Sequence, residues 1–549
     1  MDKAAVADAL ERIAQLLALK GENPFKVRAF ENAAATVTGI PDFDALVRDG
    51  KLETVKGIGK AIATEIAALA ATGTSPALAA LEKEVPATLP ELLRIPGLGT
   101  KKAAVLWKDL GVASLGELAY AIRENRLVTL PGFGEKSQKK IDEGLRFVRS
   151  TEGRWRISEA AARAEEAKAF LLSPAAKAAG VTRVEIAGEL RRGCETASGV
   201  TLVVACETPG NIPSIPEKAG APPVTLDAGP KEDFGNRLLR ATGSDAHLLA
   251  LEGRDPHGAL RSPAFEESVL YERLGLPPIP PELREGRGEV EMAAGGALPR
   301  LLEAEDLQGL FHLHTTFSDG SATLEETFCR AVELGYSYVG ITDHSPAASY
   351  ARGLTPDRVK EQWAEIGALR PKFPSLTVFR GTEADILPDG SIDYGDDFLA
   401  GFDFVIASVH SAFRLPRAEQ TARLVRAVRN PRVTMLGHPT GRLILARAGF
   451  DVDMDAVLAA AGEAGCGVEL NASPYRLDLD WRLGAAARAA GVFTSINPDA
   501  HDLDGLLDAA WGVRLARKAG FGAGDVLNAR SAEEVSARLA RLRDRPRRT

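Results

Sequence analysis

The second half of the chain repeats a strand, a loop and a helix. From residue 304 onward this unit recurs about every 30 residues, a spacing typical of a parallel sheet or an α/β barrel. Helices are predicted over Thr323–Leu334, Ala418–Val428 and Met454–Ala464. Strands are predicted over Tyr338–Thr342, Leu376–Arg380, Phe404–Ser408, Val433–Leu436, Val468–Leu470 and Val492–Ile496.

Metal-capable side chains accompany these strands. Of the 8 histidines in the chain, all but His247 and His257 fall in this segment. The candidates directly after strands are Asp343, His344, Glu383, His410, His438, Glu469, Asp499 and His501, and His312, His314 and Asp319 stand in front of them. Because parallel strands end at one edge of a sheet, we expect these residues to gather there. Strand alternation places His312 and His314 on the same side.

This residue set suits a divalent metal. Neutral imidazole with bridging carboxylate binds Zn, Mn, Fe or Co, and a set of this size holds two or three ions, with Mn or Zn favoured. The alternative is that each histidine makes an ordinary hydrogen bond in the core, which the shared placement of six histidines disfavours. With no cysteine nearby, a closed structural zinc site is also disfavoured, so open coordination positions indicate catalysis.

Three short glycine motifs divide residues 1–150. They are Val55-Lys-Gly-Ile-Gly-Lys60, Ile95-Pro-Gly-Leu-Gly-Thr100 and Leu130-Pro-Gly-Phe-Gly-Glu135, each between helical patterns. Two glycines permit a tight helix-hairpin-helix turn whose amides bind phosphate without reading a base. Plain helix C-caps are the alternative, but three copies followed by lysines favour phosphate binding. The residues expected to contact DNA are Gly57, Gly59, Lys60, Gly97, Gly99, Lys101, Gly132, Gly134 and Lys136.

Charge and composition agree with this division. The chain has a net charge of −8, whereas residues 1–150 carry 21 basic against 19 acidic side chains, so a surface for a polyanion is expected near the N-terminus. No run of about 18 apolar residues offers a membrane helix, and the first helix lacks the features of a signal peptide. The 4 cysteines form no C-x-x-C pair. We therefore expect a cytoplasmic protein without a membrane partner.

The C-terminal motifs resemble those of the PHP phosphoesterase family. They are Phe311-His-Leu-His-Thr-Thr-Phe-Ser-Asp-Gly320, Thr342-Asp-His-Ser345, Gly437-His-Pro-Thr-Gly-Arg442, Glu469-Leu-Asn-Ala472 and Asp499-Ala-His501. The resemblance implies a distorted (β/α)7 barrel. It implies the metal ligands His312, His314, Asp319, His344, Glu383, His410, His438, Asp499 and His501. Catalytic roles are expected for His312, Glu383, His410, Asp499 and Arg442, the last on a substrate phosphate.

The whole chain resembles bacterial PolX, which joins a family X DNA polymerase core to a PHP 3′–5′ exonuclease. Gly21-Glu-Asn-Pro-Phe-Lys-Val-Arg-Ala-Phe30, Ala187-Gly-Glu-Leu-Arg-Arg-Gly193 and Ile279-Pro-Pro-Glu-Leu-Arg-Glu285 carry this resemblance together with the motifs above. It implies three domains: an all-α helix-hairpin-helix domain over 1–150, an α+β palm and thumb over 151–300, and the PHP barrel over 301–549. The implied partner is DNA, gapped or with free 3′ ends, and a monomer is favoured.

The sequence departs from the family at the palm. Gly199, Thr201 and Thr225 occupy the places of three metal-binding aspartates, and Glu65 occupies the place of a lysine used in abasic-site lyase chemistry. Arg191 and Arg192, which match arginines near the incoming triphosphate, are expected to contact DNA phosphate or to support the fold.

The sequence therefore predicts a metal-dependent 3′–5′ DNA exonuclease of DNA repair that has lost polymerase activity. An active polymerase with an exonuclease is one alternative. A DNA-binding scaffold and a hydrolase of small phosphate monoesters are the others.

Overall fold

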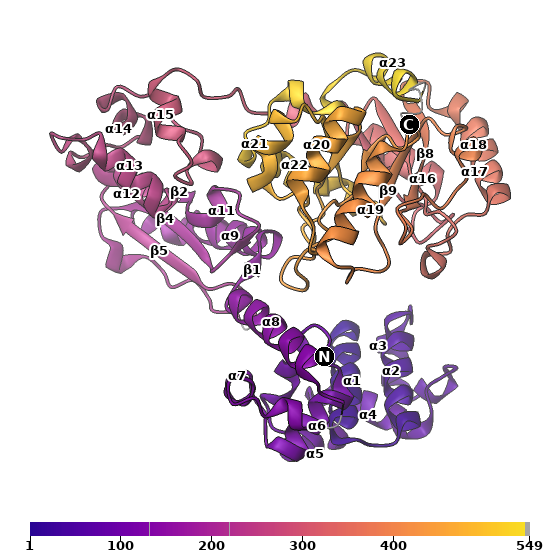
Figure 1. Cartoon of the computed structure of the whole chain (residues 1–549). Helices are drawn as coiled ribbons and strands as arrows, with labels where there is room; N and C mark the ends of the chain where they lie inside the picture. Colours follow the sequence, from indigo (N-terminus) through magenta and orange to yellow (C-terminus); the bar gives the residue numbers. More distant parts are fainter. Residues whose placement is uncertain (131, 219, 544–549) are drawn as a thin grey trace. The chain divides into compact units, whose positions relative to one another are not determined.

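The computed structural model describes residues 1–130, 132–218 and 220–543. The chain divides into two compact units, Met1–Glu152 and Gly153–Thr549, which Figure 1 shows coloured along the sequence. Within the described residues, no helix has the length and apolar character needed to cross a bilayer.

The first unit is helical, as predicted. Its α-helices are α1 (Lys3–Lys20), α2 (Pro24–Thr38), α3 (Phe43–Arg48), α4 (Lys60–Thr72), α5 (Pro76–Glu84), α6 (Thr100–Leu110), α7 (Leu115–Arg123) and α8 (Glu135–Thr151). The three glycine motifs precede three of these helices: the first precedes α4, the second α6 and the third α8. Pro131 of the third motif lies outside the described residues. Ile58, Leu98 and Phe133, the central residues of the motifs, are buried and anchor each turn in the core.

The second unit opens with a mixed α+β region. Its sheet has the order β2 (Val181–Ile186), β4 (Val200–Cys206) and β5 (Val224–Gly229), with β2 and β4 antiparallel and β4 and β5 parallel. Helices of this region include α9 (Ile157–Leu171), α11 (Gly188–Arg191), α12 (Phe234–Thr242), α13 (Asp245–Gly253), α14 (Glu267–Arg273) and α15 (Glu289–Ala294).

The remainder of the unit forms the predicted seven-stranded parallel barrel. Its strands are β6 (Gly309–Leu313), β7 (Tyr338–Ile341), β8 (Thr377–Asp385), β9 (Phe404–Ser408), β10 (Met435–Leu436), β11 (Gly467–Asn471) and β12 (Thr494–Asn497), each hydrogen-bonded to its neighbour in sequence. A parallel bridge between Leu313 and Ala500 joins β6 to the end of β12 and closes the barrel.

Helices connect the barrel strands (Figure 1). They are α16 (Leu324–Glu333), α17 (Pro356–Leu369), α18 (Asp396–Leu399), α19 (Arg417–Arg429), α20 (Met454–Ala464) and α21 (Gly484–Ala489). Two further helices, α22 (Ala509–Lys518) and α23 (Ala532–Arg543), follow the last strand.

Three strands extend further than the sequence pattern predicts. β8 runs to Asp385 rather than to Arg380, so Glu383 lies within a strand rather than after it, whereas β11 and β12 each run one residue further, to Asn471 and Asn497. The apolar pattern stops early because the last residues of these strands are polar side chains that are buried at the site.

Candidate metal centre

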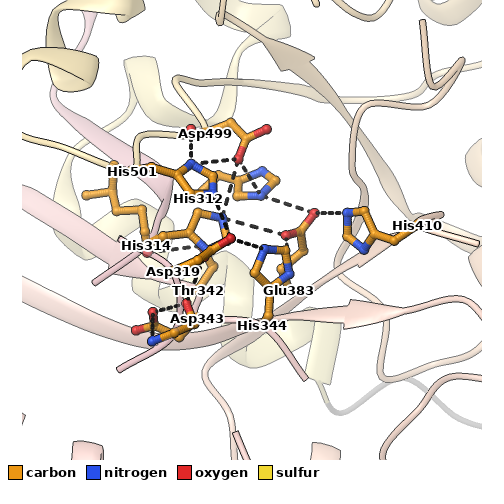
Figure 2. Close-up of polar contacts among 12 residues, drawn as sticks. His312, His314, Asp319, Thr342, Asp343, His344, Glu383, His410, Asp499 and His501 are labelled. Atoms are coloured by element: carbon orange, nitrogen blue, oxygen red, sulfur yellow. Dashed lines mark hydrogen bonds and ion pairs between the residues drawn. The ribbon is translucent and has the colours of Figure 1, made fainter. Parts of the chain in front are cut away.

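The carboxylate of Glu383 lies at the centre of a histidine cluster. This side chain is buried, and Figure 2 shows it between His344 and His410. Nitrogens of five histidines lie close to its two oxygens: His438 at 2.9 Å, His344 at 3.0 Å, His312 and His410 at 3.3 Å, and His314 at 3.6 Å. A single carboxylate therefore faces ligands contributed by strands from across the barrel.

All nine predicted ligand residues come together in this cluster. Four overlapping groups have ligand atoms within 4.8 Å of one another: His314, Asp319, His344 and His501; His312, His314 and Asp499; His344, Asp385 and His410; and Glu383, His410 and His438. Asp385 belongs to one of these groups although sequence reasoning did not select it. Its place two residues after Glu383 on the same strand is the signal that could have found it.

Several imidazoles are held by a hydrogen-bond partner on Nδ1. Nδ1 of His312 donates to Glu469 at 2.5 Å, Nδ1 of His410 donates to Asp385 at 2.8 Å, and Nδ1 of His501 donates to the Asp499 carbonyl at 2.9 Å. Each contact fixes the ring and leaves Nε2 as the atom available to an ion. Glu469 thus orients a ligand and is absent from the four groups.

Asp343 lies outside the cluster as well. It accepts hydrogen bonds from Thr315, Ser318 and Gln362, and Figure 2 shows it apart from Glu383. The expectation that Asp343 is metal-capable because it follows a strand is therefore corrected. Its side chain fixes the loop after β6 instead.

The burial and charge of the cluster fit divalent ions. Within the described chain, buried imidazole nitrogens of His312, His314, His344 and His438 have no hydrogen-bond partner. Burial lowers the pKa of His314 to about 3, with His344 acting in the same direction. Burial opposes protonation of His344, but Glu383 and Asp319 raise its pKa to about 10. Unpartnered nitrogens around shared carboxylates are sites that a metal ion satisfies.

Three residues of the cluster have a left-handed backbone. The φ angles of His312, His438 and Asp499 are +64°, +24° and +55°. Such conformations cost about 1–3 kcal/mol each in residues other than glycine and gather at functional sites. The register between β6 and β7 also shifts between Leu310 and Leu313, so the regular alternation used to group His312 with His314 is not the full cause of their proximity.

Arg442 is held by neighbouring groups. Its Nε donates to the carbonyl of Arg476, Nη2 donates to the carbonyl of Leu477, and Nη1 contacts Asp480 at 2.7 Å and Glu195 at 3.3 Å. It thereby fixes the loop that carries Arg476, whose Nε lies 3.3 Å from Asp499. Sequence reasoning missed Arg476, which no motif marked. The contact of Arg442 with a substrate phosphate stays a prediction.

The two palm arginines are engaged in the fold. Arg191 donates to both oxygens of Glu267, at 3.1 and 2.9 Å, and Arg192 donates to Glu285 at 2.9 Å. These contacts favour the alternative that the arginines support the fold over contact with DNA phosphate.

The positions that the resemblance to PolX predicts as palm metal ligands carry no charge. Thr201 and Thr225 are register partners on β4 and β5. A Cβ at Gly199 would lie 2.8 Å from the Pro223 carbonyl, so this position has no room for a longer side chain without movement. Asp227, the nearby carboxylate, forms an ion pair with Arg237.

The hairpin turns present free helix ends. Gly57, Gly97 and Gly132 have φ angles of +98°, +86° and +82°, which glycine adopts readily. Gly59, Gly99 and Gly134 are the N-caps of α4, α6 and α8, and no side chain caps these helices. Lys60, Lys101 and Lys136 are exposed beside them. Glu65, at the lyase position, accepts from the Ala77 amide at 3.1 Å.

Comparison with known families identifies the domains. A helix-hairpin-helix domain matches residues 1–75, a SAM-like helix-hairpin-helix tandem matches 89–146, and a PHP domain matches 311–473. The barrel with its histidine and carboxylate cluster is thus a metal-dependent phosphoesterase of the PHP class.

Relatives extend the similarity to the full chain. DNA polymerase/3′-5′ exonuclease PolX of Bacillus subtilis is 36% identical over 576 residues, which cover 98% of this chain and 100% of that protein. The chain therefore belongs to the PolX family. A probable phosphatase of Caldicellulosiruptor saccharolyticus is 29% identical over 35% of this chain and 78% of its own. A crystal structure of histidinol phosphate phosphatase from Lactococcus lactis is 20% identical, covers 39% of this chain and 94% of that chain, and has a TM-score of 0.31.

Proposed function

We propose that this PolX-family protein is a 3′–5′ DNA exonuclease of DNA repair whose polymerase site is inactive. One observation carries the proposal: within the described residues, every group of three or more candidate ligands lies in the PHP barrel, between His312 and His501. The palm sheet offers Gly199, Thr201 and Thr225 where carboxylates are required. Family membership and the name of the Bacillus subtilis relative support DNA as the substrate.

The barrel residues would perform defined tasks. Two or three bound divalent ions, Mn or Zn, would activate water and stabilise the charge of the transition state. Glu383 would be a ligand, because its carboxylate lies within reach of five imidazoles. Glu469 and Asp385 keep His312 and His410 in one tautomer with Nε2 turned inward. Burial of the cluster excludes bulk water and strengthens these interactions.

The palm lacks the charge that nucleotide transfer needs. Catalysis of phosphoryl transfer depends almost entirely on positioning and charge stabilisation, and two neutral threonines opposite each other do not hold Mg²⁺. Asp227 is not a substitute, because Arg237 neutralises it.

The N-terminal unit is proposed to bind the DNA backbone. Amides at the starts of α4, α6 and α8, with the exposed lysines beside them, suit phosphates and offer little to base edges. Binding should therefore be independent of sequence. Gapped DNA and DNA with free 3′ ends are the substrates we propose.

One assay tests this function. A 5′-labelled primer in gapped DNA is incubated with Mn²⁺, with and without dNTPs, using wild type and Glu383→Gln. We expect the wild type to shorten the primer in both conditions and the variant to leave it intact. Template-directed extension by the wild type would refute the inactive palm and make polymerase the main function. A control carrying Gly199→Asp, Thr201→Asp and Thr225→Asp tests whether carboxylates restore extension, although Pro223 opposes the first change.

A further inference from the structure

An aromatic side chain stands at the rim of the metal centre. Tyr350 is 68% exposed, and its ring centroid lies 6.0 Å from that of His344 and 6.3 Å from that of His410. A large apolar ring left in water costs free energy, and such a ring next to a catalytic cluster indicates a contact with substrate.

The exposure of Tyr350 does not come from a loose loop. Its neighbours Ala348 and Ala351 are buried, and the amides of Ala351 and Gly353 both donate to the Ala348 carbonyl. The loop is tied to the cluster itself, because the Leu354 amide donates to the His344 carbonyl at 2.7 Å. The ring is therefore presented on a fixed support.

A cationic side chain also lies at the metal centre. Arg476 contacts Asp499 through Nε, and within the described chain its two Nη groups have no hydrogen bond or ion pair. The backbone that carries it is fixed, because Arg442 donates to its carbonyl at 3.0 Å. Tyr350 and Arg476 thus lie at the same cluster, the ring beside His344 and His410 and the guanidinium beside Asp499.

We propose that Tyr350 and Arg476 form the binding site for the last nucleotide of an unpaired DNA 3′ end. Tyr350 stacks on the terminal base, and the Nη groups of Arg476 hold the phosphate beside the cluster. Stacking on any base face makes the site tolerant of sequence. A base pair at a duplex end must open before its base reaches the ring, so single-stranded or frayed ends are preferred.

This inference rests on the proposed function and adds two residues that position the end of the substrate. Binding is measured first, in Mn²⁺, with a single strand that carries 2-aminopurine at its 3′ end and whose last linkage is a phosphorothioate that resists cleavage. Wild type and Tyr350→Phe should quench its fluorescence, whereas Tyr350→Ala should not. Tyr120→Ala, which removes an exposed tyrosine from the N-terminal unit, is the matched control and should quench normally. Equal quenching by Tyr350→Ala would overturn the stacking site.

Activity with Mn²⁺ distinguishes the proposed exonuclease function from the proposed binding site at Tyr350 and Arg476. Tyr350→Ala should raise KM for single-stranded DNA about five- to 150-fold, the range that one lost base stack predicts, and should raise KM much less for a strand that ends in an abasic tetrahydrofuran residue, which has no base to stack. Arg476→Ala should raise KM for both substrates, and Arg476→Lys should recover part of the loss.

The outcomes are distinguishable. A wild type that cleaves DNA while Tyr350→Ala keeps its KM and its quenching defeats the inference alone. An unchanged KM in Arg476→Ala removes the phosphate contact. A wild type that cleaves neither substrate defeats the proposed function.

Discussion

Replacing Glu383 by glutamine removes one charge from the centre of the cluster and changes the side-chain shape little. The lost carboxylate lies 2.9–3.6 Å from five imidazoles, so two bound ions would lose a ligand if Glu383 lies between them. A loss of about 100-fold in affinity for each ion corresponds to about 2.7 kcal/mol. Ions present at about 100 times their Kd stabilise the folded state by about the same amount. For a barrel of this size, that is a Tm rise of roughly 5–10 °C for each ion.

Thermal unfolding in EDTA and in Mn²⁺, together with elemental analysis, measures this effect. The wild type should hold two or three ions and show the full rise in Tm, whereas Glu383→Gln should hold at most one ion and lose most of the rise. Hydrolysis should fall by more than about a hundred-fold, and DNA binding should be nearly unchanged.

A matched control separates metal loss from damage to the fold. Asp343→Asn alters another buried carboxylate of the same barrel, one that bonds Thr315, Ser318 and Gln362. It should lower Tm in EDTA and keep the rise with Mn²⁺. If Glu383→Gln keeps its full ion complement and the same rise, the reasoning about the shared ligand is wrong.

Two further predictions concern other parts of the chain. Gly57→Val and Gly97→Val put a branched side chain at φ angles of +98° and +86°, so they should weaken DNA binding, which in wild type should fall steeply with salt in an anisotropy titration. Glu267→Gln leaves buried Arg284 without its carboxylate and should destabilise the second unit by about 3–5 kcal/mol. Burial raises the pKa of Glu267, but Arg284 lowers it by more, so the pKa in the folded protein lies below the usual value. This stability is complete above the usual carboxyl pKa and is lost as pH falls through the lowered pKa of the folded protein. The melting temperatures of wild type and variant should therefore converge in acid.

The fold class followed from sequence because helix and strand periods are strong local signals. The helix Met454–Ala464 and the strand Phe404–Ser408 have the predicted bounds. The end of β8 was missed because Glu383 and Asp385 are polar, and burial inside a barrel is a tertiary property that no local pattern reports. Asp385 was overlooked for the same reason.

The sequence predicted which residues form the candidate site but not the role of each residue. Histidine counts and strand ends indicated eleven candidates, and the resemblance to the PHP family implied nine of them as ligands; these nine, Glu383 among them, gather in one cluster because topology brings strand ends together. The orienting role of Glu469 and the place of Arg476 depend on contacts across many residues of sequence, such as His312 with Glu469. The left-handed backbone of His312 depends on the packed barrel and has no sequence signal in a histidine.

Because of where the barrel closes, bound ions would also stabilise the contact between its first and last strands. The first and last strands meet through few bonds: the His314 amide donates to the Ala500 carbonyl at 2.9 Å, and the Ala500 amide donates to the His312 carbonyl at 3.2 Å. The group of His312, His314 and Asp499 spans this seam. An ion held there would link the first and last strands of the sheet. Chelation should therefore accelerate hydrogen exchange at the amides of His314 and Ala500 before it affects the middle strands. Loss of metal should thus open the barrel first between β6 and β12.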